Sequence, residues 1–173
     1  LEEKLPYIHN RVGFNFRMTE MQSIVGINEL ARLETWNLPR RFEYAKMYRE
    51  ALGKLEGVKS LPVDTEERQC AYWWFPIILD LDKLDIDAPA FLKEMAGMGI
   101  PCYGIQWPEA YEEKAYKELG GFGSHKFPFC SKEYTREGLT YEGVVCPVAK
   151  SLRARTVNLF LHPTWEKEHI QRV

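Results

Sequence analysis

An apolar run at residues 71–81 constrains the fold of this chain more strongly than any other segment. It contains the sequence YWWFPIIL, which is rich in the aromatic and β-branched residues that favour strands. We therefore predict the strongest strand of the chain here. Pro76 lies inside the run and cannot donate a hydrogen bond to a neighbouring strand, so we expect a bulge or an edge position at this residue.

Two helices are predicted ahead of this strand. Thr19 and Gln22 form a capping box, and apolar residues follow them at helical spacing, which predicts a helix over residues 19–36. A second helix is predicted over residues 40–52, with Pro39 in its first turn. The two helices can join as one kinked rod.

The remaining elements follow one another without a regular β-α-β pattern. We expect strands at residues 58–62, 100–105 and 156–161, helices at residues 90–98, 108–119 and 146–153, and a last helix that Thr164 caps. Strands separated by single helices can pair antiparallel. The predicted fold class is therefore α+β, with a small, mostly antiparallel sheet and helices on one face.

Composition and charge exclude several classes of function. The formal net charge is -2 and the basic residues are scattered, which argues against binding of nucleic acid. No apolar run approaches the roughly 20 residues that a membrane-spanning helix needs. The four cysteines lack Cys-x-x-Cys spacing, and no histidine stands at zinc-finger spacing, so we expect reduced thiols and no metal site. We expect a cytoplasmic protein that binds neither nucleic acid nor a membrane.

Residues 13–22 hold the clearest candidate for a binding site. Asn15 and Arg17 stand just ahead of the capped helix start at Thr19. The free N–H groups and the dipole of a helix start favour a phosphate or a carboxylate, and an amide and a guanidinium are suited to hold one. The alternative is a capped helix with an exposed arginine in front of it.

Other residues indicate chemistry less specifically. Lys126 suits either a Schiff-base lysine or a solvated lysine on a glycine-rich surface loop. His162 follows a predicted strand, where sites often collect, although a lone histidine there is more often a hydrogen-bonded structural residue. His9 suits either a ligand contact or loop packing. Trp73 and Trp74 offer a stacking platform, unless one of them belongs to the core.

Residues 13–22, together with Gly26 and residues 30–33, resemble the DegT/StrS-type aminotransferases. These are pyridoxal-phosphate enzymes with the aspartate aminotransferase fold, and they aminate keto-sugars or keto-cyclitols. Softer similarities to the same family follow at residues 98–102, 146–149 and 159–163.

The resemblance implies a domain boundary after residue 17. Residues 1–17 would be a loop carried over from the large domain, bearing the cofactor-phosphate motif, and residues 18–173 would be the C-terminal small domain. The large N-terminal domain would be absent. The chain also begins without Met, in what reads as a loop, so we expect a piece of a larger protein.

The resemblance also implies roles for individual residues. Asn15 matches the family's asparagine that reaches into the neighbouring subunit and hydrogen-bonds the cofactor phosphate, which implies a homodimer with shared active sites. Arg17 matches an arginine close to the cofactor or substrate. The family's Schiff-base lysine precedes this motif, so it is expected upstream of Leu1, and Lys126 does not match it. The chain alone is therefore expected to be inactive.

The function implied by the resemblance is transfer of an amino group, with pyridoxal 5'-phosphate as cofactor. The donor would be glutamate or glutamine, and the acceptor a keto-sugar of a sugar nucleotide or a keto-cyclitol. Residues 103–108 are nearer to the branch that acts on cyclitols or related ketones. The candidate substrate contacts are Tyr103, Trp107, His162 and His9. The alternative is a non-catalytic binding or regulatory domain with the same fold.

Overall fold

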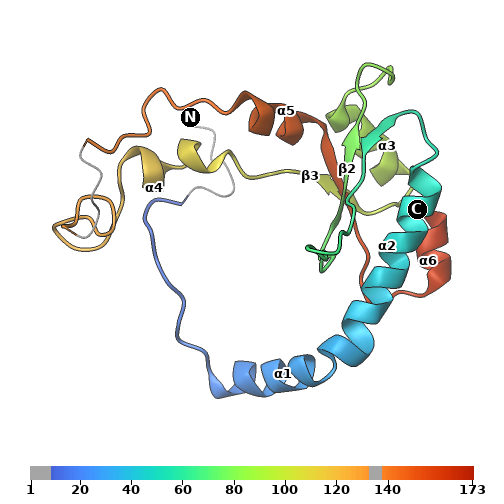
Figure 1. The fold of residues 1–173 in the computed structure, drawn as a ribbon, viewed down its shortest axis with the longest axis horizontal. Helices are drawn as coiled ribbons and strands as arrows, with labels where there is room; N and C mark the ends of the chain where they lie inside the picture. The colour runs from blue at the N-terminus through green and yellow to red at the C-terminus, as the bar shows by residue number, and fades with distance from the viewer. Residues whose placement is uncertain (1–8, 133–137) are drawn as a thin grey trace. The chain divides into compact units, whose positions relative to one another are not determined.

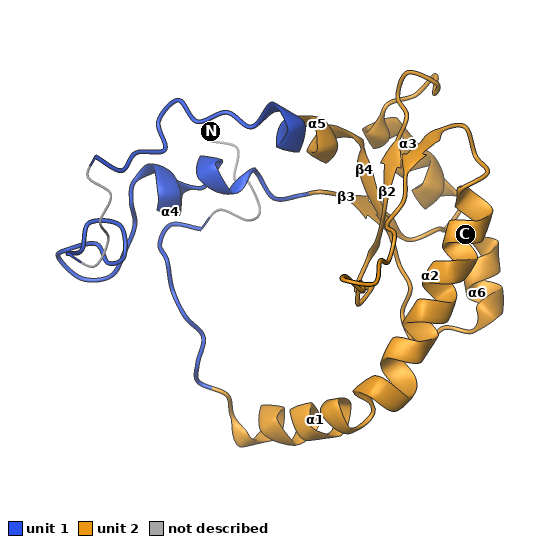
Figure 2. Cartoon of the chain, in the orientation of Figure 1, with its two compact units in different colours: residues 1–17, 106–150 blue, residues 18–105, 151–173 orange. Residues whose placement is uncertain are grey.

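The structure, a computed structural model, describes residues 9–132 and 138–173 of the chain. It divides the chain into two compact units (Figure 2). Unit 1 comprises residues 1–17 and 106–150, and unit 2 comprises residues 18–105 and 151–173. The division into a carried-over loop at residues 1–17 and a small domain at residues 18–173 stays a prediction, and residues 1–8 of that loop lie outside the described residues.

Unit 2 is built on an antiparallel sheet of four strands among the described residues (Figure 1). The strand order is β1-β2-β4-β3. The strands are β1 (Val58–Ser60), β2 (Phe75–Leu79), β3 (Cys102–Gly104) and β4 (Thr156–Leu159). The prediction of a small antiparallel sheet is confirmed, and each of the four strands lies inside a range predicted from sequence.

Pro76 occupies a local edge inside a central strand. The strand β2 lies between β1 and β4, yet β1 pairs only with Ile78 and Leu79. On the other side, Pro76 is paired with Asn158 of β4. Because the pairing with β1 does not extend to Pro76, its missing N–H costs no hydrogen bond on that side.

Helices cover one face of this sheet. Alternate residues of β2 are buried, which is the pattern of a strand with one face toward a core. The helices that contribute to the core are α2 (Leu38–Leu52), α3 (Ala88–Gly97) and α6 (Lys167–Arg172). The buried cluster comprises Tyr44, Ala45, Tyr48, Tyr72, Phe75, Ile77, Leu79, Ala88, Val157, Leu159, Leu161 and Ile170. The predicted α+β class with helices on one face is confirmed.

The two N-terminal helices form a continuous rod. The first, α1 (Glu20–Ala31), begins at the predicted capping box: the Thr19 N–H donates to Gln22 Oε1 over 2.9 Å, and the Gln22 N–H donates to Thr19 Oγ1 over 3.3 Å. A π-helical turn, η1 (Leu33–Asn37), then leads directly into α2. The first helix was predicted to continue to residue 36, but the α-helix ends at Ala31, and the two helices join through the π-helical turn.

The predicted helix over residues 108–119 was wrong in its continuity. The structure contains a 3₁₀ turn, η2 (Ala110–Glu112), and a short helix, α4 (Lys114–Lys117). Between them, Glu113 is extended, with φ -62° and ψ 139°. The helix predicted at residues 146–153 is present as α5 (Pro147–Arg155), which begins one residue later and ends two residues later than predicted.

Two further expectations need correction. The strand predicted from residue 71 begins only at Phe75, because Tyr72 has a left-handed backbone with φ 50°. Thr164 does not cap the last helix. Its hydroxyl lies 2.7 Å from His162 Nδ1, and α6 begins after Glu166, whose N–H donates to His169 Nδ1 over 3.1 Å.

None of the helices in the described parts of the chain is long and apolar enough to cross a bilayer. All four cysteines are free thiols; two are half-buried and two are exposed.

Candidate functional site

The segment that carries Asn15 and Arg17 is held in place by residues 113–122 of the same unit. The Ala115 N–H donates to the carbonyl oxygen of His9 over 2.8 Å, and the Val12 N–H donates to the carbonyl oxygen of Gly120 over the same distance. These contacts join parts of unit 1 that are about a hundred positions apart in sequence. Main-chain hydrogen bonds therefore support the segment ahead of α1.

Glu113 makes the most extensive of these contacts. Its side chain is buried, and Oε2 accepts the main-chain N–H of His9 over 2.8 Å while Oε1 lies 3.0 Å from His9 Nδ1. Burial by itself would raise the pKa of Glu113, but the hydrogen bonds from the main chain and the ring of His9 lower it below its usual range. The carboxylate is thus held in its charged form by its two contacts to one residue.

Three stacked phenylalanine rings orient the next part of the segment. Phe14 and Phe16 stack with centroids 4.8 Å apart, and Phe14 also stacks on Phe122 with centroids 5.4 Å apart. These ring contacts tie residues 14 and 16 to Phe122 of the same unit. Asn15 and Arg17 lie in the same stretch, and both are exposed.

Asn15 and Arg17 form a donor set that suits a phosphate. Both residues are exposed, and no hydrogen bond or ion pair within residues 9–132 and 138–173 engages either side chain. The guanidinium carries only donors, and the amide of Asn15 offers two more. The sequence-based prediction of an anion site at this segment has donor chemistry and exposed side chains in its favour.

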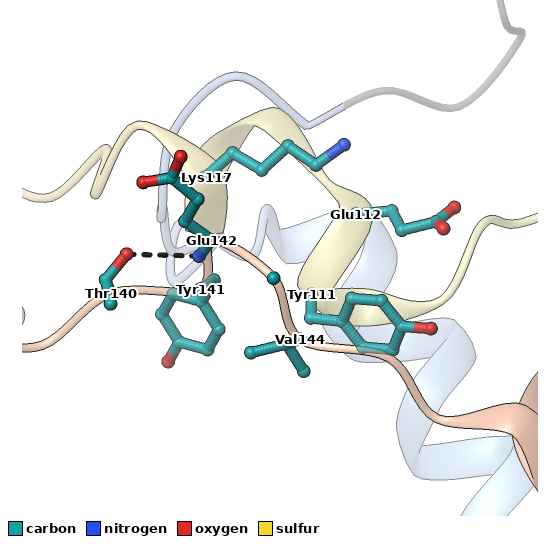
Figure 3. Close-up of a pocket in the computed structure, with 8 residues that line it drawn as sticks. Tyr111, Glu112, Lys117, Thr140, Tyr141, Glu142 and Val144 are labelled. Atoms are coloured by element: carbon teal, nitrogen blue, oxygen red, sulfur yellow. Dashed lines mark hydrogen bonds between the residues drawn. The ribbon is translucent and has the colours of Figure 1, made fainter.

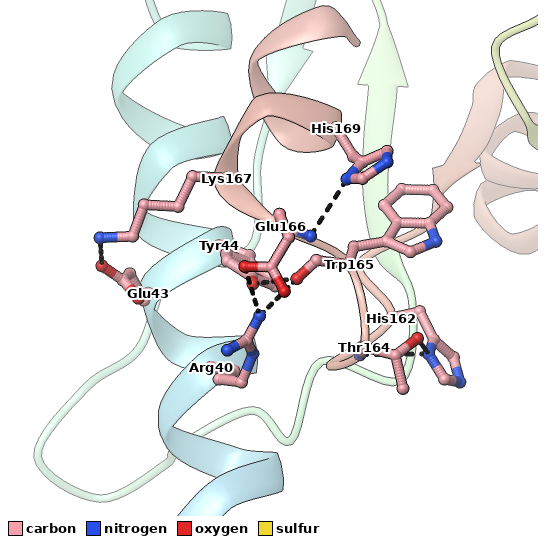
Figure 4. A network of polar contacts seen from close by, with 9 residues as sticks. All are labelled: Arg40, Glu43, Tyr44, His162, Thr164, Trp165, Glu166, Lys167 and His169. Carbon is pink, nitrogen blue, oxygen red and sulfur yellow. Dashed lines mark hydrogen bonds and ion pairs between the residues drawn. The ribbon is translucent and has the colours of Figure 1, made fainter.

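His162 lies in unit 2, in a loop fixed on α2 (Figure 4). Its Nδ1 accepts the Thr164 N–H over 3.3 Å and lies 2.7 Å from the Thr164 hydroxyl, so the neutral ring carries its proton on Nε2. Arg40 of α2 donates to the carbonyl oxygen of Trp165 over 2.6 Å, and the hydroxyl of Tyr44 donates to the same oxygen. The loop therefore presents an exposed imidazole with a defined tautomer.

Tyr103 belongs to an aromatic cluster in the same unit. Its ring meets Trp74 edge-on at 4.9 Å and Phe160 at 4.7 Å between centroids. Burial, together with the neighbouring thiol of Cys102, raises the pKa of Tyr103. Trp74 is half-buried in this cluster, whereas Trp73 is 71% exposed. Of the two tryptophans considered from the sequence, Trp74 therefore packs and Trp73 is exposed.

The two units divide the predicted site residues between them. His9, Asn15, Arg17 and Trp107 belong to unit 1, and Tyr103 and His162 belong to unit 2. The side chain of Trp107 is 47% exposed. Within unit 1, His9 and Asn15 share one supported segment.

Lys126 has the environment of a surface residue. Its Nζ donates to the carbonyl oxygen of Glu118 over 3.3 Å in an exposed setting, and its backbone has a positive φ of 47°. These contacts favour the interpretation of a solvated lysine on a glycine-rich loop.

A hollow of about 420 Å³ opens in unit 1 (Figure 3). One side is formed by Tyr111, Glu112 and Lys117, and the other by residues 140–144, where Thr140 Oγ1 accepts the Glu142 N–H over 3.0 Å. Its lining contains none of the residues that the sequence singled out. It is an open polar hollow, and no strongly perturbed titratable group lines it.

Sequence reasoning missed Glu113, Gly120 and Phe122. Each of them contacts the segment ahead of α1 from more than a hundred positions away. Glu113 lies in a stretch that reads as an ordinary charged helix, so no local pattern distinguishes it from its neighbours.

The chain matches the model of the DegT/DnrJ/EryC1/StrS aminotransferase family over residues 2–139. Among curated proteins it is similar to an uncharacterized protein, MJ1066, of Methanocaldococcus jannaschii. The two are 27% identical over 125 residues, which is 72% of this chain and 32% of that protein.

Two solved structures share the fold. An aminotransferase from Psychrobacter cryohalolentis is 25% identical with a TM-score of 0.66, and the match covers 96% of this chain and 39% of that one. GDP-4-keto-6-deoxymannose-3-dehydratase with a trapped PLP–glutamate geminal diamine is 17% identical with a TM-score of 0.61, covering 92% and 35%. The chain therefore spans little more than a third of the length of these solved proteins.

Proposed function

We propose that this chain, which belongs to the DegT/DnrJ/EryC1/StrS aminotransferase family, is the C-terminal part of a pyridoxal-phosphate-dependent aminotransferase. The amino group would pass from glutamate or glutamine to a keto-sugar of a sugar nucleotide or to a keto-cyclitol. The observation that carries the proposal is the exposed pair Asn15 and Arg17 on a segment that contacts of its own unit support.

In this proposal, Asn15 and Arg17 bind and orient the cofactor. The amide of Asn15 donates to the phosphate, and the guanidinium of Arg17 adds charge-assisted donors to the phosphate or to a substrate anion. When bound, pyridoxal phosphate supplies the electron sink for the transfer. The lysine that binds the cofactor covalently lies outside residues 1–173, so the chain alone would be inactive.

We further propose a homodimer in which Asn15 and Arg17 serve the site of the neighbouring subunit. The surface of α1 supports a macromolecular contact, because no residue of this helix is buried. Its exposed apolar side chains are Met21, Ile24, Val25, Ile27 and Leu30, between 58% and 76% accessible. So much apolar surface on one helix marks an interaction surface.

His162, Tyr103, Trp107 and His9 stay proposed substrate contacts. His162 has the best support, since Thr164 occupies its Nδ1 and leaves the Nε2–H as an outward donor to a substrate oxygen. The Nδ1 of His9 is engaged by Glu113, so its Nε2 is the atom open to a ligand.

The test is the affinity of the protein that carries this chain for pyridoxal phosphate, measured by absorbance titration. Loss of a hydrogen bond to a charged group costs roughly 1.5–3 kcal/mol, so Asn15→Ala should weaken binding about tenfold or more. Pyridoxal, which lacks the phosphate, should bind Asn15→Ala and the unmodified protein equally.

Asn10→Ala and Arg11→Ala are matched controls, because both residues are exposed on the same segment. They should leave the affinity unchanged. An unchanged affinity in Asn15→Ala would refute the phosphate role. A protein that never binds pyridoxal phosphate would instead favour a non-catalytic binding or regulatory domain.

A further inference from the structure

We infer that Glu113 is a positioning residue that sets the place of Asn15 by clamping the segment from His9 to Arg17. This inference rests on the proposed phosphate role of Asn15. It assigns a function to a buried acid that lies outside the phosphate motif and is not among the residues that line the hollow, namely residues 111, 112, 117 and 140–144.

The first support is the way Glu113 uses both carboxylate oxygens on one residue. One oxygen accepts the main-chain N–H of His9 and the other contacts the imidazole. A contact to the main chain fixes the course of the backbone, and the contact to the ring fixes the direction of the side chain. Together they fix the position of His9, at the start of the segment.

The second support is the backbone of Glu113 itself. The residue interrupts the helical turns on both sides with an extended conformation, although the surrounding sequence favours a helix. The break brings the Ala115 N–H to the carbonyl oxygen of His9 over 2.8 Å. Glu113 is thus not helical at the point where the chain contacts the segment.

The third support is the close approach of Gly120 to the segment. A Cβ at this position would lie 2.7 Å from the carbonyl oxygen of Asn10 and 3.4 Å from Arg11 Cα. The Val12 N–H reaches the Gly120 carbonyl oxygen over 2.8 Å. Any side chain at residue 120 would therefore push the segment away without removing a charge.

The clamp contacts the segment at His9, six positions before Asn15, and further contacts hold the residues between them. Val12 is fixed at Gly120, and Phe14 is fixed on Phe122. Asn15 is the next residue. If the contacts of His9 with Glu113 are lost, Asn15 and Arg17 keep their donor groups. The segment then loses the contact that fixes the position of its first residue.

The experiment combines hydrogen exchange and cofactor affinity in the protein that carries this chain. Glu113→Ala and Gly120→Ala should both accelerate exchange of the His9 and Val12 amides, while the amides of β2 stay protected. Both variants should lower the affinity for pyridoxal phosphate about tenfold and leave the affinity for pyridoxal unchanged. Glu113→Gln should restore protection and affinity, because an amide oxygen can still accept the His9 N–H.

Glu118→Ala is the matched control, since Glu118 is exposed on the same stretch and its carboxylate makes an ion pair with Lys114 at 3.9 Å. It should change neither readout. A double-mutant cycle with Asn15→Ala completes the test: if Glu113 acts through Asn15, the double variant should bind no more weakly than Asn15→Ala alone.

The outcomes separate this inference from the proposed function. Unchanged exchange of His9 and Val12 in Glu113→Ala overturns the inference, whatever the affinities are. A second result also overturns the inference: Glu113→Ala accelerates exchange but leaves the cofactor affinity unchanged, whereas Asn15→Ala weakens it. In that case the proposed function stands. Faster exchange with no effect of Asn15→Ala supports the clamp and refutes the phosphate role.

Discussion

The rings of Phe14 and Phe16 stack with their planes 14° apart, and the ring of Phe14 also stacks on Phe122. These ring contacts attach the stretch that contains Asn15 and Arg17 to the rest of unit 1. Asn15 and Arg17 themselves are exposed. If Asn15 binds the cofactor phosphate as proposed, the binding depends on the ring contacts that hold this stretch.

Removing the ring of Phe122 should weaken cofactor binding. A stacked aromatic pair contributes about 0.5–1.5 kcal/mol, so Phe122→Ala should lower the affinity for pyridoxal phosphate about 2- to 12-fold. Phe122→Tyr keeps the stack with Phe14 and should bind like the unmodified protein. Equal losses in the two variants, measured by absorbance titration, would contradict the role of the stack.

Thr19→Ala should destabilise α1 by about 1 kcal/mol, because the Gln22 N–H loses its acceptor. The loss should appear as faster hydrogen exchange in the first turn of α1. Thr19→Ser retains the hydroxyl and should behave like the original residue. If Ser and Ala accelerate exchange equally, the capping contact is not what holds this helix start.

Asp64 should be the most sensitive acidic residue of unit 2. It accepts the Cys70 N–H over 2.9 Å and the hydroxyl of buried Tyr72, and it pairs with Arg49 at 3.2 Å. Asp64→Ala leaves these partly buried donors without their acceptor and should cost about 1–3 kcal/mol of unfolding free energy in urea. Asp82→Ala, at an exposed site, should change it by less than about 0.5 kcal/mol. Equal effects would contradict the network.

The same network predicts a loss of stability at high pH. Burial and the hydrogen bond to Asp64 raise the pKa of Tyr72 from 10.0 to about 12, against the opposing charge of Arg49. Between these values the unfolded chain releases the proton while the folded chain retains it. The contribution of Tyr72 is therefore complete below pH 10 and is lost as the pH rises to about 12.

Tyr72→Phe isolates this effect because it has no hydroxyl to ionise. The unfolding free energy of the unmodified chain should fall more steeply between pH 10 and pH 12 than that of Tyr72→Phe, by a nearly constant amount for each pH unit. Parallel curves would show that Tyr72 ionises alike in the folded and unfolded chains.

Features set by neighbouring residues could be predicted from the sequence. The Thr19–Gln22 capping box needs only residues three positions apart, and both of its hydrogen bonds are present. The strand around Ile77 follows from local composition and burial alternation. In each case the interaction that decides the structure lies within the stretch that predicts it.

Features set by distant residues could not be predicted. The strand start moved to Phe75 because Tyr72 is held with φ 50° while Arg41 Nη1 donates to its carbonyl oxygen over 2.6 Å. The helix over residues 108–119 broke at Glu113, whose partner is 104 positions away. Thr164 has the right chemistry for a cap, but its hydroxyl lies beside His162.

For the candidate site, the sequence identified the donors but not their support. Asn15 and Arg17 stand in a recognisable motif, whereas Glu113 and Phe122 have no pattern that ties them to it. The contacts that hold the motif depend on chain closure over a hundred residues, which local propensity does not encode.

The most direct test of the central claim is subunit complementation in the full-length protein. One variant carries Asn15→Ala with Arg17→Ala, and the other lacks the cofactor-binding lysine. If Asn15 and Arg17 serve the neighbouring subunit, a mixed dimer contains one complete site. Unfolding and refolding the two variants together at equal amounts should then restore about a quarter of the unmodified activity. Activity no higher than the sum of the separate variants would contradict the account.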